Sequence, residues 1–223
     1  VEVQRDGERL TLQPTQLILA TGMSGVPNVP SYPGAEAFKG QQHHSSRHPG
    51  GDAWSGKRAV VIGANNSAHD ICADLVENGA EVTMVQRSST HIVRSDSLME
   101  LVFGGLYSED AVESGLTTDK ADMLFASIPY KVMPSFHQPV FDAIKERDKD
   151  FYEGLTKAGF MLDFGDDESG LFMKYVRRGS GYYIDVGACE LIADGTIKLK
   201  SGPGLGVDHI EPDAVVLNDG SRL

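Results

Sequence analysis

Residues 60–70 read VVIGANNSAHD, in which an apolar run meets Gly63 and then gives way to a polar stretch. The apolar run predicts a buried strand. From about residue 67 to residue 78 the apolar side chains recur at helical spacing, and residues 81–85 (EVTMV) predict a second strand. A strand, a turn, a helix and a strand within about 30 residues form a βαβ unit, which predicts a parallel sheet.

The turn after the first strand has the residue types that a dinucleotide-binding loop needs. Such a loop takes small residues where the chain turns, approaches a pyrophosphate and packs against the helix. Gly63 and Ala68 fill the first and last of these positions, and Asn65 fills the middle one, where its tolerance of positive φ keeps the turn feasible. Asn66 and Ser67 add side-chain donors to the free N–H groups of the helix start. The alternative is an ordinary glycine turn between a strand and a helix.

The end of the second strand indicates which dinucleotide is bound. An NAD-preferring site places an acid there to accept a hydrogen bond from the ribose 2′-hydroxyl. This sequence has Arg87 and Ser88 at that place and no acid. A guanidinium pairs with a 2′-phosphate and a hydroxyl adds a donor, so the pattern favours NADPH over NADH. The alternative is a solvent-exposed arginine on a loop.

The segments before and after this unit predict further elements. Asp6-Gly7 predicts a hairpin turn, and residues 16–20 (QLILA) predict a strand buried on both faces. Residues 95–160 predict successive helices, with breaks at the three prolines Pro129, Pro134 and Pro139. After about residue 170, the stretches KYVRR, YYIDV, TIKLK and HIEPDAVVL predict short strands.

Composition limits the class of protein. A hydrophobic content of 40% and a charged content of 23% are those of a soluble globular protein. A net charge of −12 argues against nucleic acid or an anionic membrane as the partner, although a local cationic pocket can still hold an anionic cofactor. Cys72 and Cys189 form no CxxC pair, and the sequence has no apolar run long enough to span a membrane. We expect a cytoplasmic location.

Both ends of the sequence resemble cuts through a longer chain. Val1-Glu2-Val3 already lies inside a strand-like pattern, and a turn at Asp219-Gly220 comes only three residues before the last residue, Leu223. We therefore expect these 223 residues to be an excerpt of a larger protein.

A histidine-rich segment precedes the βαβ unit. Residues 38–48 contain His43, His44 and His48, but no carboxylate or thiol lies among them and the surrounding Ser, Pro and Gly residues disfavour a helix, so we expect no metal site. A connector whose polar side chains bond its own backbone is the plainer interpretation. The segment resembles the FxGxxxHxxx(Y/F/W) signature of class B flavoprotein monooxygenases, the flavin-containing and Baeyer–Villiger monooxygenases.

Four motifs carry this resemblance in the family's order. Phe38, Gly40 and His44 match the signature, while His48 stands where the family has an aromatic residue. Leu19-Ala20-Thr21-Gly22 resembles the strand at which such enzymes leave their FAD domain. GANNSAHD resembles their second dinucleotide turn, and VTMVQRSS resembles their NADPH-selective strand.

The resemblance implies an α/β fold: a Rossmann-like NADPH-binding domain with a helical insertion, flanked by remnants of an FAD domain. Residues 1–27 would be the C-terminal strands of a truncated FAD-binding domain, and residues 28–223 the NADPH-binding domain, with the insertion at about 95–170. The cofactor-binding residues it implies are these: Thr21, Gly22, His44, Gly63, Asn65, Asn66, Ser67, Ala68, Arg87 and Ser88. No catalytic residue is indicated.

The activity that the resemblance implies is FAD- and NADPH-dependent monooxygenation. NADPH reduces FAD, and the reduced flavin lets one oxygen atom of O₂ enter a small organic substrate by N- or S-oxygenation. FAD would be held mainly by residues upstream of Val1, so the excerpt alone would be inactive. Neither the substrate nor the oligomeric state is indicated.

The sequence leaves three alternatives to N- or S-oxygenation by a flavin enzyme. Baeyer–Villiger oxidation of ketones competes with N- or S-oxygenation because His48 departs from the signature. A non-catalytic NADP-binding module would need native termini near Val1 and Leu223. A pyridine-nucleotide disulfide reductase is disfavoured because the sequence has no CxxC dithiol.

Overall fold

The computed structural model describes residues 1–20, 22 and 25–223, and the chain divides into two units, Val1–Pro30 and Ser31–Leu223. In the first unit, strands β1 (Glu2–Arg5) and β2 (Glu8–Thr11) pair antiparallel. Asp6 has a φ of 50° and Gly7 a φ of 86°, the positive values that both central residues of a type I′ turn require. The hairpin prediction is confirmed.

The strand predicted for residues 16–20 is wrong. These residues adopt no strand, and Leu17, Ile18 and Leu19 are 60%, 83% and 78% exposed. Apolar composition alone does not make a strand, because the backbone N–H and C=O groups also need a neighbouring strand as partner. In the described part of Val1–Pro30 the only paired strands are β1 and β2.

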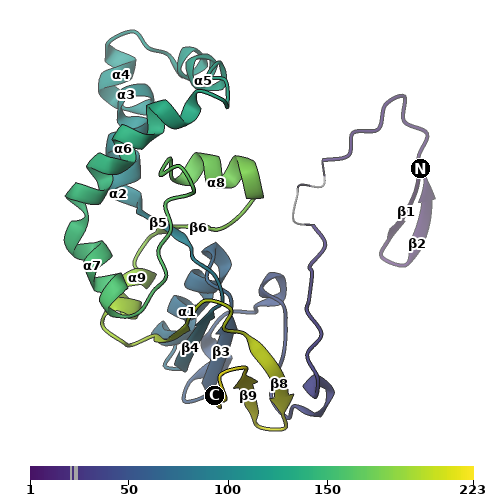
Figure 1. Ribbon diagram of the computed structural model, residues 1–223. Coiled ribbons are helices and arrows are strands. Elements are labelled where there is room, and N and C mark those ends of the chain that lie inside the picture. The colour runs from purple at the N-terminus through teal and green to yellow at the C-terminus, as the bar shows by residue number, and fades with distance from the viewer. Residues whose placement is uncertain (21, 23–24) are drawn as a thin grey trace. The chain divides into compact units, whose positions relative to one another are not determined.

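The second unit is built on the predicted βαβ element. Strand β3 (Arg58–Ile62), helix α1 (Asn66–Glu77) and strand β4 (Glu81–Gln86) follow one another, and β7 (Lys198–Ser201) pairs with the far side of β4. Both pairings are parallel, in the order β3-β4-β7 (Figure 1). The prediction of a mixed α/β fold with a parallel sheet is therefore confirmed.

Shorter elements complete the strands of this unit. β5 (His91–Arg94) pairs parallel with β6 (Tyr182–Asp185), and β8 (Val207–Glu211) forms a hairpin with β9 (Ala214–Leu217). Helix α9 (Ala188–Ala193), which the sequence did not predict, lies between β6 and β7. Single 3₁₀ turns occur at η1 (Ala35–Ala37), η2 (Ser45–Arg47) and η3 (Asp52–Trp54).

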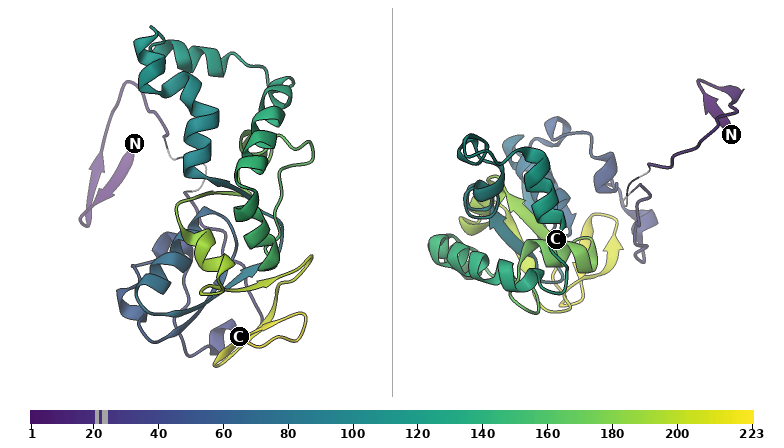
Figure 2. Two further views of the ribbon diagram at one scale, coloured as in Figure 1. Left: turned by 90° about the vertical axis from the view of Figure 1, so that its left-hand side faces the viewer. Right: turned by 90° about the horizontal axis from the view of Figure 1, so that it is seen from above.

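Helices fill the long connection between β5 and β6, as predicted for residues 95–160. Their bounds are α2 (Ser95–Ser97), the π-helical η4 (Leu98–Phe103), α3 (Gly104–Tyr107), α4 (Glu109–Glu113), α5 (Thr118–Ala126), α6 (Met133–Arg147), α7 (Lys149–Lys157) and α8 (Leu171–Arg178). Within this unit, α3, α4 and α5 lie at the end away from the β3-β4-β7 sheet, and α6 and α7 lead back toward it (Figures 1 and 2). In the described part of the chain, none of the helices combines the length and the apolar character that a membrane crossing demands.

Two details of the predicted helices and strands are wrong. Pro134 lies in the first turn of α6, where its missing N–H is no loss, and Pro139 lies inside the same helix, so neither proline ends a helix. The KYVRR stretch is the last part of α8, not a strand. Gly170 precedes α8 and Gly179 follows it, both with positive φ, and Arg177 and Arg178 occupy its last turn, where cations are favourable.

One core joins the sheet to the helices. Val82 of β4 and Ile92 of β5 are fully buried in the same cluster as Ile144 of α6 and Leu155 of α7. A smaller cluster, in which Val85 packs with Leu205, Val215 and Leu217, covers the hairpin side. The helical connection is therefore an integral part of the domain's core.

Replacing Ile144 by Ala is expected to lower the free energy of unfolding by about 2–4 kcal/mol, because it leaves a cavity in this shared core. Urea unfolding measures the change. Met123→Ala is the matched control, since that side chain is 74% exposed on α5 and its loss costs little. A loss below about 1 kcal/mol for Ile144→Ala would show that α6 does not share the core.

Candidate functional site

The turn between β3 and α1 is shaped by one glycine. Gly63 has a φ of 141°, a conformation that side chains rarely adopt, and its N–H donates to the Val85 carbonyl of β4 at 3.0 Å. A Cβ at Gly63 would lie 3.7 Å from that of Ala68, so α1 packs closely on the strand end. Asn65 has a φ of −105°. The left-handed tolerance that we invoked for Asn65 is therefore not needed, because Gly63 makes the turn.

The first turn of α1 begins at an N-cap residue that leaves its hydrogen-bond donors uncapped. Asn65 is the N-cap residue and makes no side-chain capping hydrogen bond. Its carbonyl accepts the N–H groups of Ala68 at 3.0 Å and His69 at 3.1 Å, which fixes the helix start. Asn66 accepts a hydrogen bond on Oδ1 from Ile184 N at 3.4 Å, so its amide nitrogen remains a donor, and Ser67 is exposed. This end of the helix can receive an anion.

Arg87 and Ser88 lie at the same edge of the sheet as this turn. Strands β3 and β4 are parallel with Ile62 opposite Val85, so the residues that follow each strand leave at the same edge. Arg87 and Ser88 directly follow β4, and both are exposed. The structure thus brings together Gly63, Asn65, Asn66, Ser67, Ala68, Arg87 and Ser88 at two neighbouring strand ends.

His69 contacts the turn from the buried side of α1. The sequence did not predict this role. Its ring is fully buried, its Nδ1 lies 3.0 Å from the Asn65 carbonyl, and it stacks on Tyr183 with ring centroids 4.1 Å apart. Burial lowers the pKa of His69 to about 4, despite the opposing effects of the Asn65 carbonyl and Asp185. The ring is therefore neutral at physiological pH, and Nδ1 is the protonated nitrogen that donates to Asn65.

The histidine segment forms a hydrogen-bonded connector. His44 caps its own 3₁₀ turn, its Nδ1 accepting the Ser46 N–H at 3.2 Å. His48 Nε2 lies 2.7 Å from Asp74 Oδ2 on α1, and His48 Nδ1 lies 3.3 Å from His43 Nε2. Within residues 1–20, 22 and 25–223, no three His, Cys, Asp or Glu side chains are grouped so as to hold a metal ion. His44 is thus engaged in the connector, and its hydrogen bonds go to Ser46 and Arg47, not to the turn at Gly63.

Thr21 and Gly22, which the sequence also predicted as cofactor-binding, belong to the first unit. Gly22 is exposed with a φ of 69°, and Thr21 lies outside the described residues.

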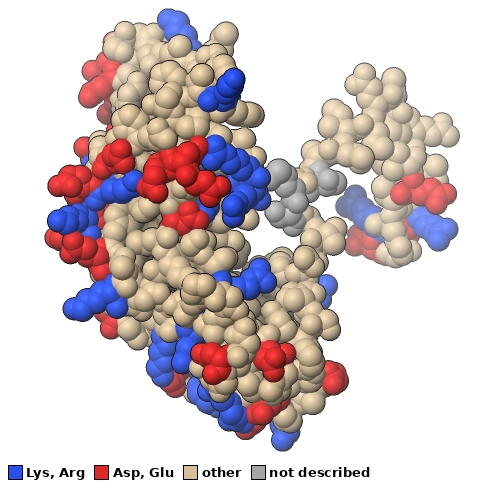
Figure 3. All heavy atoms as spheres, in the orientation of Figure 1, with Lys and Arg blue, Asp and Glu red and all other residues tan. Residues whose placement is uncertain are grey.

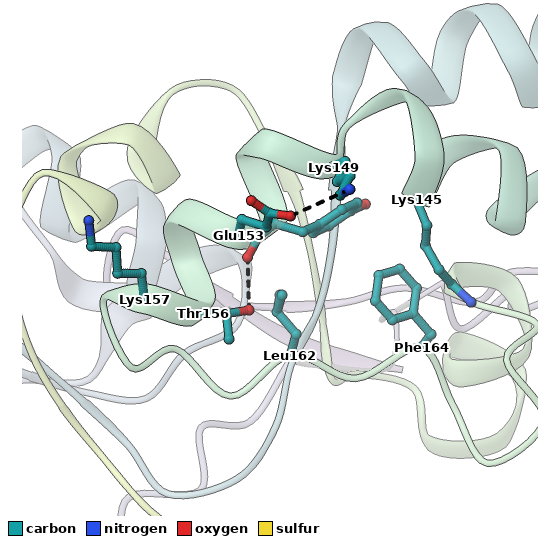
Figure 4. A pocket seen from close by; sticks show the side chains of 8 residues that line it. Lys145, Lys149, Glu153, Thr156, Lys157, Leu162 and Phe164 are labelled. Carbon is teal, nitrogen blue, oxygen red and sulfur yellow. Dashed lines mark hydrogen bonds and ion pairs between the residues drawn. The ribbon is translucent and has the colours of Figure 1, made fainter.

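A separate pocket of about 520 Å³ opens between α6, α7 and residues 162–164. Leu162 and Phe164 form its apolar side, and Lys145, Lys149 and Lys157 line it (Figure 4). Lys145 pairs with Glu168 at 2.7 Å and Asp142 at 3.0 Å, and Lys149 lies 3.9 Å from Glu153. Carboxylates thus compensate two of the three lysines, which weakens the attraction of the pocket for an anion. The face in Figure 3 likewise shows acidic and basic side chains intermingled.

A protein-family profile described as pyridine nucleotide-disulphide oxidoreductase matches residues 2–125, more than half of the sequence. The chain belongs to the pyridine nucleotide-disulphide oxidoreductase family.

The relatives found by sequence are monooxygenases, which confirms the resemblance to class B flavoprotein monooxygenases. Indole-3-pyruvate monooxygenase YUCCA4 of Oryza sativa subsp. japonica is 39% identical over 88 residues, covering 40% of this chain and 20% of the relative. The probable indole-3-pyruvate monooxygenase YUCCA10 of Arabidopsis thaliana is 27% identical over 210 residues, covering 92% of this chain and 45% of the relative. Dimethylaniline monooxygenase [N-oxide-forming] 2 of Cavia porcellus is 37% identical over 97 residues, covering 42% and 18%. The chain therefore spans less than half the length of these relatives.

Solved structures show the same fold. Cyclohexanone monooxygenase from Rhodococcus sp. Phi1, bound to NADP⁺, is similar with a TM-score of 0.56 at 17% identity, covering 92% of this chain and 43% of that one. An ε-caprolactone-bound cyclohexanone monooxygenase gives a TM-score of 0.54 at 16% identity, covering 88% and 43%.

The cysteines of this family member do not suit disulfide chemistry, although the family name includes it. Cys72 and Cys189 are both free and buried. Burial raises the pKa of Cys72 to about 12 and also raises that of Cys189. Thiol–disulfide exchange needs an accessible thiolate, which neither residue provides at physiological pH.

We predict that stability falls between pH 6.5 and pH 4. Burial lowers the folded-state pKa of His69 and His91 to about 4, so the unfolded chain binds more protons in this window. The stabilisation is complete above pH 6.5 and is lost as the pH falls, by roughly 3 kcal/mol for each ring at about 1.4 kcal/mol per pKa unit.

Urea unfolding at several pH values tests this, with His69→Gln expected to reduce the slope by about one proton. His209→Gln is the control. That ring is exposed and its hydrogen bond to Asp208 raises its pKa, so in the folded protein it gains its proton above this pH window. A wild-type stability that is constant from pH 4 to 6.5 would contradict the prediction.

Proposed function

We propose that this chain is the NADPH-binding part of an FAD-dependent monooxygenase that inserts one oxygen atom of O₂ into a small organic substrate. One observation carries the proposal: the open first turn of α1 and the exposed Arg87 leave the same edge of a parallel sheet. Ligands of such sheets bind outside the carboxyl ends of the strands, with a pyrophosphate at the helix start.

The residues at this edge fit NADPH. The N–H groups of the α1 start, with the Asn66 amide and the Ser67 hydroxyl, would hold the diphosphate, and Gly63 and Ala68 keep the turn small. Arg87 and Ser88 would hold the 2′-phosphate. The strand order β3-β4-β7 is that of one half of a Rossmann-like domain, which supports the assignment of residues 28–223 to it. The NADP⁺ bound in the cyclohexanone monooxygenase of similar fold is in keeping with this ligand.

FAD supplies the electron transfer and oxygen activation in the proposed reaction. We assign FAD mainly to parts of the protein outside these 223 residues, because the sequence contains no second turn that resembles GxGxxG and spans less than half of its relatives. Residues 1–27, which include the exposed apolar residues 17–19, would complete that FAD domain. On this proposal the 223 residues alone bind NADPH but have no oxygenase activity. The contribution of this chain is to bind and orient the nicotinamide cofactor.

The substrate is proposed at the level of chemical class. N- or S-oxygenation is the first candidate, in line with the dimethylaniline monooxygenase [N-oxide-forming] relative. Oxygenation of a carbonyl compound, including Baeyer–Villiger oxidation, is the second, since other relatives are named indole-3-pyruvate monooxygenases. Turnover of a tertiary amine, a thioether, a ketone and a 2-oxo acid by the full-length protein separates these candidates.

Arg87→Ala is expected to weaken NADPH binding by roughly 10- to 100-fold, which corresponds to the loss of one charge-assisted hydrogen-bonded pair. The affinity for NADH should stay within about twofold of the wild-type value. Isothermal titration calorimetry of the full-length protein with each cofactor measures both. Arg58→Ala is the matched control, because Arg58 begins β3 at the opposite edge of the sheet. Equal binding of NADPH and NADH by the wild type would overturn the proposal.

Ser67→Asp is expected to weaken the binding of NADPH and of NADH by roughly tenfold each, because a carboxylate at this position repels the diphosphate that both cofactors carry. The fold should not suffer, since an acid in the first turn of a helix is favourable. The uncharged Ser67→Asn is the control for side-chain size. Unchanged binding of both cofactors by Ser67→Asp would show that the diphosphate lies elsewhere.

A further inference from the structure

The loop that follows β4 is held by a segment 75 residues further along the chain. The side chain of Gln86 is fully buried and forms two hydrogen bonds with the backbone of Met161: its Nε2 donates to the carbonyl at 3.0 Å and its Oε1 accepts the N–H at 2.8 Å. A side-chain amide paired in this way fixes the backbone on both sides of the contact.

The other end of the loop is held by the same segment. The Thr90 N–H donates to the Met161 carbonyl at 3.0 Å, and the Ser89 hydroxyl donates to Asp163 Oδ2 at 2.8 Å. Arg87 and Ser88 are thus bracketed by Gln86 on one side and by Ser89 and Thr90 on the other. They are the two residues of the loop that remain exposed.

Asp163 is in turn fixed by a buried cation. Lys174 of α8 is only 6% exposed, and its Nζ lies 2.5 Å from Asp163 Oδ2, while the Gly165 N–H donates to Oδ1 at 2.6 Å. Partial burial acts to raise the pKa of Asp163, but Lys174, Gly165 and Ser89 together hold it at about 2. The carboxylate therefore stays charged and able to accept the Ser89 hydroxyl at any physiological pH.

The side chains on either side of Asp163 anchor the segment to the helices. Leu162 and Phe164 point toward the pocket beside α7 (Figure 4), while Asp163 is bonded to Ser89 and Lys174. Extended chain alternates its side chains in this way. Segment 161–165 is thus packed between helices α6 and α7 and the loop after β4.

We infer that Ser89, Asp163 and Lys174 form a positioning unit that sets the preference for a 2′-phosphorylated dinucleotide by holding Arg87 and Ser88 in place. The inference rests on the proposed NADPH site, to which it adds residues that do not touch the cofactor. A loop fixed before binding loses less conformational entropy when a guanidinium pairs with a phosphate. The benefit applies only to NADPH, because NADH has no group for Arg87 to bind.

Ser89→Ala and Lys174→Met in the full-length protein test this unit. Each variant is expected to raise the Kd for NADPH about fivefold to tenfold, the usual value of one hydrogen bond or more, and to leave the Kd for NADH within about twofold. Calorimetric titration with both cofactors gives the ratio of the two affinities. If the unit had a purely structural role, the variants would instead weaken the binding of NADPH and of NADH by the same factor.

Arg177→Met is the matched control. Arg177 lies on the same helix α8 and its Nη2 pairs with Asp167 Oδ2 at 2.6 Å, but the structure shows no link from this pair to Ser89. Its loss should not change the ratio of affinities. Ser89→Ala removes a single hydroxyl, so it keeps the test valid if Lys174→Met fails to fold.

The outcomes separate this inference from the proposed function. If the wild type prefers NADPH and Arg87→Ala abolishes the preference, but Ser89→Ala leaves it intact, the positioning unit alone is refuted. The same holds if Ser89→Ala weakens NADPH and NADH equally. If the wild type shows no preference for NADPH, the proposed function fails and this inference fails with it.

Discussion

Helix α1 can begin directly beyond strand β3 because Gly63 adopts a φ of 141° and carries no side chain. The rest of the domain depends on this short connection. It brings the helix close enough for Ala68 to pack against the strand end, and it lets the chain return in parallel as β4 with Ile62 opposite Val85. As a result, the start of α1 and the residues after β4 share one edge of the sheet, where a diphosphate and a 2′-phosphate can be bound together.

Buried polar side chains hold the distant parts of the domain to this edge. Gln86 and Lys174 are of types usually found at the surface, and histidine is of intermediate burial, yet all three of Gln86, His91 and Lys174 are nearly or fully buried. Each has a partner in residues 161–163, because His91 Nδ1 also lies 3.1 Å from the Asp163 carbonyl. A buried polar group without a partner would be costly, so these contacts favour one arrangement of the helical insertion over others.

The sequence predicted the elements whose signals are local and missed those that depend on distant partners. The unit from β3 to β4 was recovered because its periodicity, its glycine turn and the end of its helix lie within about 30 contiguous residues. The apolar run at residues 17–19 has the composition of a buried strand, but composition does not supply a neighbouring strand. The stretch KYVRR was predicted as a strand because apolar and charged residues alternate in it. It is instead the end of helix α8, which begins upstream at Leu171. Likewise, no local pattern links Ser89 to Asp163, 74 residues away.

The departure of His48 from the signature also has an explanation in a contact with a residue distant in sequence. An aromatic residue at position 48 would attach the connector by apolar packing. His48 instead attaches it through a 2.7 Å contact between its Nε2 and Asp74 Oδ2, and Asn78 Nδ2 donates to Asp74 Oδ1 at 3.1 Å. Asp74 lies on α1, the helix whose start forms the candidate site. His48 and Asp74 are therefore best understood as a pair that attaches the connector to α1 through a directional hydrogen bond, while the His48 ring also stacks on His43 with centroids 5.6 Å apart.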